Sequence, residues 1–476
     1  MLFTSLHFLW FFAAVWASYW ILARRRSAQN VLLLGASAFF YGYWDWRFLL
    51  LILASTLLDF GAGLWLERPG LSQARRKAIV TTSLVFNLGA LALFKYYDFF
   101  VESAAELLQS FGFQAHDWTL RLVLPVGISF YTFQTLSYTI GRYRGTTPVA
   151  RNLIDFATYV AFFPQLVAGP IVRAEELLPQ LQTRRRFRWS DQAEGLELAM
   201  WGLFKKVVIA DNLAPAVDAV FGAESEVGWL ARLIAVYAFT VQIYCDFSGY
   251  TDIARGTAQA LGFRFPLNFR RPYFSSDAQE FWRRWHMTLS TWLRDYLYIS
   301  LGGNRRGPRR TQLNLMLTML LGGLWHGAAW NFVLWGGYQG LLLIGHRIWA
   351  GRRGDRAHGV VGRALVWFGF MQLVCFGWLL FRAESLEQIL AFVTPTDASA
   401  LAGLALSETV VSGLVLGGAG AVLLIFWDLL QARAEPRETP LIGAPVAVRV
   451  TVTVGLVLLV SLFGRFLGND FIYFQF

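Results

Sequence analysis

Two histidines, His286 and His326, are the residues best suited to chemistry among the six histidines of the chain. His286 lies in a basic, tryptophan-rich stretch, and His326 lies between Trp325 and Gly327 in an apolar run long enough to cross a bilayer. Imidazole has a pKa of about 6.5, so it can take up and release protons near neutral pH. A titratable group at membrane depth is costly to bury, which makes it a candidate functional residue.

Each of these histidines also has a structural interpretation. His286 stands among aromatic residues and could be an interfacial anchor. His326 could be a buried hydrogen-bond partner between helices. For the other four histidines the structural interpretation is favoured, because they lie near a terminus, at a segment end or in loops: His7, His116, His346 and His358.

The stretch around His286 predicts an amphipathic helix at a membrane surface. Apolar and aromatic residues from Trp282 to Tyr296 recur at helical spacing, and the arginines fall between them. Most arginines from Arg264 to Arg310 are expected to mark the cytoplasmic side, although some could hold phosphate groups.

Composition places the chain among polytopic membrane proteins. Of its 476 residues, 56% are hydrophobic and 15% are charged, and the mean hydropathy is +0.44, which is too apolar for a soluble protein. The net charge of +11 could indicate nucleic acid, but the basic residues form short blocks between apolar segments. That pattern is typical of membrane topology, so we expect the lipid bilayer and no nucleic acid as a partner.

The two cysteines, Cys245 and Cys375, lie in apolar surroundings without CxxC spacing or a neighbouring histidine. We therefore expect neither a disulfide framework nor a metal site. The first apolar run lacks a basic start and a small-residue cleavage site, so we expect it to be retained.

The apolar segments predict an all-α protein with about eleven or twelve transmembrane helices in a single domain, residues 1–476, without a soluble domain. Lys and Arg on alternate loops place those loops in the cytoplasm and both termini outside. The run 153–172 is broken by prolines and flanked by basic residues on both sides, which is typical of a re-entrant segment. The crossing segments are expected at 2–22, 31–44, 48–66, 79–100, 120–140, 196–221, 230–244, 313–349 (two segments), 364–381, 410–430 and 446–463.

Six stretches together resemble the membrane-bound O-acyltransferase family, and within it the bacterial branch that serves O-acetylation of exported polysaccharides such as alginate. They read GISFYTFQTLSY (127–138), FFPQLVAGPIVR (162–173), FKKVVIADNLA (204–214), CDFSGYTDIARG (245–256), FWRRWHMTLSTWLRDYLYISLGGNRRG (281–307) and GLWHGAAWNFVLWG (323–336). The resemblance implies transfer of an acyl group, usually acetyl, from a cytoplasmic thioester to a hydroxyl acceptor handled outside the membrane. It implies no bound cofactor.

The resemblance also implies that His326 is the catalytic histidine of the family and His286 its second motif histidine. Acyl transfer to a hydroxyl needs a base that takes the proton as oxygen attacks the thioester carbonyl, and a buried imidazole stays neutral and basic. We expect His326 to be that base and His286 to position the donor or relay a proton. The two should approach one another across a water-accessible tunnel that opens to the cytoplasm beside the helix from Trp282 to Tyr296. The expected donor-side residues are Trp282, Arg283, Arg284 and Trp285.

Two further residues are candidates for supporting roles. Asp246 could orient a catalytic histidine, although a buried pair with an arginine is the favoured interpretation. The aromatic residues near the C-terminus could be an interfacial anchor. The segment from Gly464 is nevertheless long enough to fold back to His326, and the phenol of Tyr473, with a pKa of about 10, leaves more readily than a sugar hydroxyl. We therefore hypothesise that Tyr473 is an acyl relay.

The expected location is the bacterial inner membrane with both termini in the periplasm. The expected donor is acetyl-CoA or an acyl carrier protein thioester, and the expected partner is a periplasmic acetyltransferase of the same polymer system. Two other functions stay open. A transporter or flippase would also use many crossings and a buried histidine, although the sequence lacks internal repeat symmetry. An inert scaffold for a periplasmic acetyltransferase is the other alternative.

Overall fold

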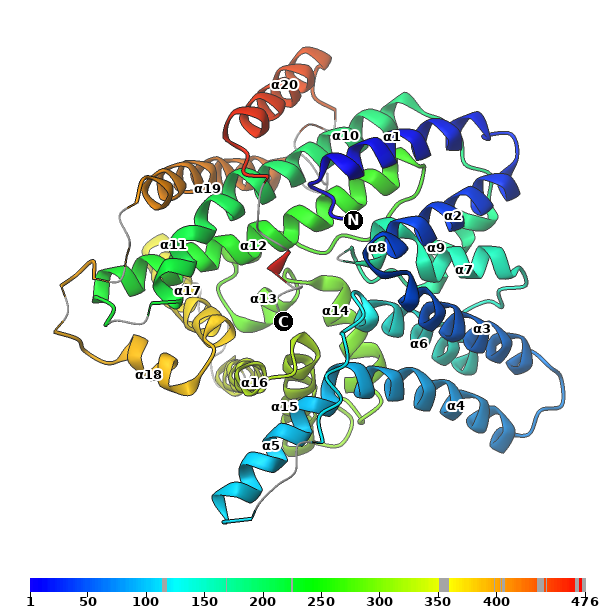
Figure 1. Ribbon diagram of the computed structural model, residues 1–476, viewed down its shortest axis with the longest axis horizontal. Coiled ribbons are helices and arrows are strands. Elements are labelled where there is room, and N and C mark those ends of the chain that lie inside the picture. The colour runs from blue at the N-terminus through cyan, green and yellow to red at the C-terminus, as the bar shows by residue number, and fades with distance from the viewer. Residues whose placement is uncertain are drawn as a thin grey trace. The chain divides into compact units, whose positions relative to one another are not determined.

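The computed structural model describes residues 1–113, 118–167, 169–223, 226–350, 359–397, 399–402, 404, 407–434, 441, 443–466 and 471–472. Every regular element within these residues is a helix, and none of them forms a strand. The predicted all-α class is therefore confirmed (Figure 1).

The chain divides into two compact units. The first holds Met1–Gly195 and Thr257–Pro266, and the second holds Leu196–Gly256 and Leu267–Phe476. The single domain predicted for residues 1–476 stays a prediction.

The first unit packs short and long apolar helices around a polar interior. Within it α3, α4 and α6 contact one another, and α2 packs against α7 (Figure 1). Its helices are α1 (Leu6–Ile21), α2 (Arg26–Asp45), α3 (Leu49–Leu66), α4 (Gln73–Leu91), α5 (Tyr97–Ser110), α6 (Ile128–Arg144), α7 (Leu153–Ala161), α8 (Phe163–Leu166) and α9 (Ala174–Gln182), with η1 (Trp46–Phe48) and η2 (Ala92–Tyr96) between them.

A buried carboxylate, Asp59 on α3, ties the first unit together. It accepts hydrogen bonds from the Asn87 amide at 2.8 Å, from the Thr139 hydroxyl at 2.6 Å and from the Ser83 hydroxyl. These donors lie on α4 and α6, so one satisfied polar group joins three helices. A buried polar group is tolerated among apolar helices only when it is hydrogen-bonded in this way.

Of two predicted segments of the first unit, one begins later than predicted and the other is interrupted as predicted. Helix α6 begins at Ile128 instead of the predicted residue 120, because Pro125 and Gly127, which has a φ of 76°, interrupt the chain before it. The break predicted in the run 153–172 is confirmed at Phe162, between α7 and α8. The membrane placement of that run stays a prediction.

The second unit contains most of α12 (Trp229–Ala260) and the second half of α10 (Trp189–Leu203). Helices α15 and α16 form its closest pair, and α19 packs against α11 and η3 (Figure 1). Its other elements are η3 (Phe204–Ala210), α11 (Asp211–Phe221), η4 (Pro272–Phe274), α13 (Ala278–Trp282), α14 (Met287–Trp292), η5 (Leu293–Tyr298), α15 (Pro308–His326), α16 (Trp330–Ala350), α17 (Val360–Arg382), α18 (Leu386–Val393), α19 (Glu408–Ala434) and α20 (Val446–Phe463).

The prediction of a continuous helix from Trp282 to Tyr296 is wrong, because the helix is interrupted before Met287. Helix α13 ends at Trp282, His286 adopts a φ of 40°, and α14 begins at Met287. The physical reason is competition for backbone hydrogen bonds. The Met287 N–H donates to the Asn268 carbonyl at 2.8 Å, and the Arg270 N–H donates to the Arg284 carbonyl at 2.9 Å. The segment at 268–270 thus takes groups that a continuous helix would use.

Within the described residues, six helical segments are long and apolar enough to cross a membrane. They are Arg26–Leu66, Gln73–Ser110, Trp229–Ala260, Val360–Arg382, Glu408–Ala434 and Val446–Phe463. The predicted polytopic class agrees with these segments. The predicted number of about eleven or twelve crossings stays a prediction.

Glycines set the close approach of α15 and α16. A Cβ at Gly336 would lie 2.3 Å from the Met319 carbonyl oxygen, and one at Gly323 would lie 2.2 Å from the Phe332 carbonyl oxygen. Small residues let helix backbones approach closely in membranes. This crossing fixes the last turn of α15, which ends at His326.

We predict that Gly336→Ala lowers thermal stability, because the added methyl group must push two backbones apart at a cost of about 1–3 kcal/mol. Gly345→Ala on the same helix is the matched control, since its Cβ meets nothing within 4 Å. That control should be neutral or slightly stabilising through helix propensity. Thermal unfolding of the two purified variants in detergent checks this. Equal melting temperatures would contradict the close crossing.

Candidate active site

His326 is the last residue of α15 and lies inside the second unit, with 4% of its surface exposed. Among the described residues, three aromatic rings surround it nearly edge-on. Their centroids lie 5.1 Å away for Trp325, 5.1 Å for Trp335 and 5.5 Å for Phe381. These rings come from α15, α16 and α17, so three helices fix the position of the imidazole.

His286 is completely buried at the break before α14. Its Nδ1 lies 3.0 Å from Oδ1 of Asn268. That oxygen is an acceptor, because it also receives the Thr288 backbone N–H at 3.2 Å and the Thr288 hydroxyl at 2.9 Å. The hydrogen of His286 therefore sits on Nδ1, which leaves a lone pair on Nε2. No hydrogen-bond partner for Nε2 lies among the described residues.

Burial also sets the protonation of His286. Removal from water disfavours the charged imidazolium, and it lowers the pKa of His286 to about 3. The ring is therefore a neutral acceptor across the physiological pH range. Asn268, which fixes its tautomer, was not singled out from the sequence, and its position in a loop with no recurring pattern offered no signal.

The structure brings both candidate histidines to one indole ring. The Trp325 ring lies 6.0 Å from the His286 ring and 5.1 Å from the His326 ring, measured between centroids. The sequence predicted that the two would approach one another, and the shared Trp325 contact agrees with that prediction. The tunnel predicted beside them stays a prediction.

The four predicted donor-side residues have different environments. Trp285 is a core residue, 1% exposed, with its ring 4.7 Å from that of Trp378. Trp282 is half-buried and lies 5.9 Å from the Trp335 ring that contacts His326. Arg284 is engaged with Glu280 at 2.6 Å, whereas Arg283 is exposed.

Asp246 on α12 pairs with a lysine, so the predicted arginine partner is wrong. Its Oδ1 lies 2.6 Å from Nζ of Lys206, which also contacts Asp211 at 2.8 Å. The neighbouring Lys205 contacts Asp252 at 2.6 Å. Neither lysine was predicted as a partner of these carboxylates, although charged residues inside an apolar segment were the available signal.

The second oxygen of Asp246 holds the segment that precedes Tyr473. It accepts the Ile472 backbone N–H at 2.8 Å. Phe471 is fully buried, and its ring lies 5.6 Å from that of Phe247, which in turn lies 4.7 Å from the His286 ring. Tyr473 itself lies outside the described residues. The chain immediately before it is thus anchored among the neighbours of His286.

We predict that Asp246→Asn destabilises the protein by about 3 kcal/mol, at the lower end of the range for breaking a buried ion pair, because Lys206 keeps Asp211. The variant should also make the segment at Phe471 and Ile472 more sensitive to protease. Glu67→Gln is the control, because Glu67 and its partner Arg151 are 39% and 78% exposed and such pairs contribute less than about 1 kcal/mol. Equal loss of thermal stability in both variants would refute the anchoring role.

Comparison with known proteins shows which family and which relatives this chain resembles. Residues 39–376 match the membrane-bound O-acyltransferase family. The probable alginate O-acetylase AlgI of Azotobacter vinelandii is 45% identical over 81% of this chain and 76% of that protein. The corresponding Pseudomonas aeruginosa protein is 42% identical over 92% of this chain and 84% of its own length. The peptidoglycan O-acetyltransferase of Helicobacter pylori is 35% identical over 75% of this chain and 71% of that protein.

The family match covers most of the chain and includes both histidine motifs. Membership of an enzyme family argues against the alternatives of a carrier and an inert scaffold. The six apolar helical segments agree with the membrane setting of the family. The chain belongs to the membrane-bound O-acyltransferase family and is a multi-pass membrane acyltransferase.

Proposed function

We propose that this acyltransferase moves an acetyl group from a cytoplasmic thioester to a system that O-acetylates an exported polysaccharide such as alginate. The observation that carries this proposal is the placement of His286 and His326 against the single indole of Trp325. The relatives named for alginate and peptidoglycan O-acetylation support an acetyl group and a polysaccharide acceptor.

In the proposed reaction His326 is the general base. The acceptor hydroxyl gives its proton to the imidazole while its oxygen attacks the thioester carbonyl. The tetrahedral intermediate then expels the thiolate, which recovers the proton from the imidazolium. The new ester and a free thiol are the products. General-base catalysis of this kind contributes about 10²–10⁴-fold in rate.

We assign His286 the role of positioning the donor. Its Nδ1–H is engaged by Asn268, so Nε2 can accept a hydrogen bond from an amide or hydroxyl of the donor. A relay of protons through His286 is disfavoured, because its Nδ1–H is committed to the amide oxygen of Asn268, which does not take up a proton and pass it on. His326 and His286 would thus have separate tasks.

The proposed donor, membrane location and partner are those expected from the sequence. The donor is acetyl-CoA or an acyl carrier protein thioester on the cytoplasmic side of the bacterial inner membrane. Both termini lie in the periplasm, where a periplasmic acetyltransferase of the same polymer system receives the acetyl group. The positive blocks between apolar segments support this orientation.

We predict that His326→Gln lowers acetyl transfer by about 10²–10⁴-fold, because glutamine keeps hydrogen bonding but cannot act as a base. The measurement is thiol release from acetyl-CoA or acetyl carrier protein, with alginate oligomer or purified periplasmic transferase as acceptor. His346→Gln is the control, since His346 contacts Asp277 at 3.6 Å and has no part in the proposed reaction.

Normal turnover by a folded His326→Gln protein would remove His326 from the mechanism. Loss of polymer acetylation with full thiol release would place the defect after the first transfer. Matching membrane abundance of the His326→Gln and His346→Gln proteins makes either result interpretable.

We further predict that Tyr473→Phe abolishes polymer acetylation but leaves the fold intact. In this step the acetyl group moves from the thioester sulfur to the phenol oxygen, with the phenol proton passing to His326, and the periplasmic transferase then takes the acetyl group and releases the phenol. The anchored Phe471 and Ile472 support this reach. Mass spectrometry of the wild-type C-terminal peptide should show acetyl-Tyr473. Unchanged polymer acetylation by Tyr473→Phe would leave this segment as an anchor.

A further inference from the structure

The first unit contains a pocket of about 360 Å³ whose charge is strongly one-sided. Its volume falls in the range of small-ligand sites. Five guanidinium groups face a single carboxylate, that of Asp191. We name this site the arginine pocket. The arginines are Arg184, Arg185, Arg186, Arg188 and Arg264.

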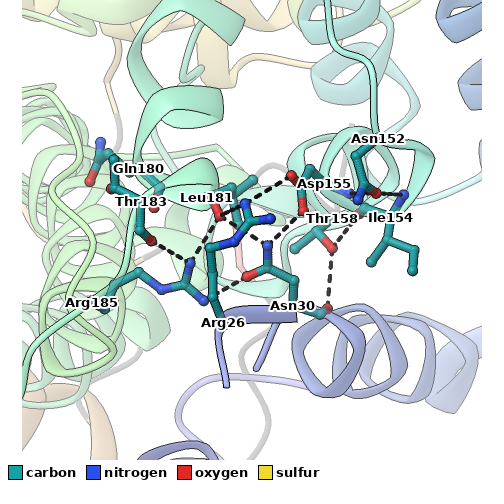
Figure 2. Close-up of polar contacts among 10 residues, drawn as sticks. All are labelled: Arg26, Asn30, Asn152, Ile154, Asp155, Thr158, Gln180, Leu181, Thr183 and Arg185. Atoms are coloured by element: carbon teal, nitrogen blue, oxygen red, sulfur yellow. Dashed lines mark hydrogen bonds and ion pairs between the residues drawn. The ribbon is translucent and has the colours of Figure 1, made fainter. Parts of the chain in front are cut away.

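Arg185 forms a fixed wall of the arginine pocket. It is 5% exposed, and its guanidinium donates to the Asn30 side-chain oxygen at 2.6 Å and to the Leu181 and Thr183 carbonyls at 2.9 and 3.0 Å. Figure 2 shows these bonds together with the Asn30 amide that donates to Asp155 at 2.7 Å. The network joins α2, α7 and the end of α9, so the pocket wall is held in place before any ligand arrives.

The opposite wall is held by Gln180 on α9. Its side-chain oxygen accepts the Arg264 backbone N–H at 2.8 Å, and its amide donates to the Arg264 carbonyl at 2.9 Å. The Arg264 side chain reaches Asp191 at 3.2 Å. The only carboxylate of the pocket is therefore already paired.

Arg186 and Arg188 carry positive charge that the single carboxylate of the pocket does not neutralise. Both are exposed, and no ion pair or hydrogen bond of either guanidinium occurs within the described parts of the chain. Two guanidinium groups two residues apart can each present a planar pair of N–H donors. That arrangement suits the oxygens of a phosphate group better than it suits a single carboxylate.

Aromatic residues beside the arginine pocket indicate a membrane surface. Trp189 is 79% exposed, and the Phe187 ring lies 5.0 Å from it and 5.1 Å from the Trp20 ring of α1. Exposed tryptophan next to arginine is typical of the boundary between lipid and water. Arginines at that level attract anionic headgroups.

We propose that the arginine pocket binds a phosphate group through Arg186 and Arg188. The phosphate can come from two sources, the headgroup of an anionic phospholipid or the phosphates of a soluble coenzyme. Binding at this pocket does not depend on acyl transfer, so the proposal stands apart from the catalytic roles of His286 and His326.

The experiment measures equilibrium binding to the purified full-length protein in nonionic detergent, with dioctanoyl phosphatidylglycerol as one probe and coenzyme A as the other. We expect Arg186→Gln/Arg188→Gln to weaken binding of the true ligand by about tenfold or more, since each charge-assisted contact is lost. Affinity should also fall as salt is added. Binding of phosphatidylglycerol alone identifies a lipid site, and competition by coenzyme A identifies a site for the phosphates of a soluble coenzyme.

The matched control is Arg75→Gln/Lys77→Gln, which removes the same charge from two exposed residues elsewhere in the first unit. This control should bind like wild type. Dioctanoylglycerol, which has no phosphate, should not compete. The proposal is overturned if neither phosphate probe binds, if dioctanoylglycerol binds equally well, or if the control variant weakens binding as much as the loss of Arg186 and Arg188.

Discussion

The interior of the second unit depends on one buried ammonium group, that of Lys206, held between two carboxylates. Removing three charges from water costs several kcal/mol for each ion, and only close pairing offsets that cost. Asp246 also accepts the Ile472 N–H, which satisfies part of its remaining negative charge. The ion cluster therefore joins η3, α11, α12 and the segment at 471–472. Replacing it with apolar groups would fill the space but would not hold the last described residues beside Phe247.

The chemistry of the two histidines follows from their different surroundings. His286 has one nitrogen committed to Asn268 and no compensating carboxylate among the contacts described, so burial alone sets its charge. His326 is enclosed by indole and phenyl rings on three helices. Aromatic walls fix the orientation of the imidazole ring. Such walls suit a base that must meet its proton donor in one orientation.

The sequence predicted what depends on local hydropathy and missed what depends on contacts between distant residues. Helix α20 has the predicted bounds, 446–463, because an apolar run determines it. The break at His286 was missed because helical spacing continues through it, and the cause lies in backbone bonds to Asn268 and Arg270. Asp246 was recognised as a buried acid, but its lysine lies forty residues earlier, beyond the reach of any local pattern.

The two adjacent lysines lie in a π-helical turn, η3, and both are buried. Gly249 of α12 lies where α12 crosses the chain from Gly202 to Lys206. A Cβ at Gly249 would approach the Gly202 carbonyl oxygen to 2.7 Å and the backbone nitrogen of Lys206 to 3.1 Å. Asp246 and Asp252 lie three residues before and after Gly249, about 9 Å apart along the helix axis. Lys206 reaches the first and Lys205 the second. Glycine at the crossing and one ion pair on each side of it thus fix the register of η3 on α12, which is the register that presents Phe247 to His286.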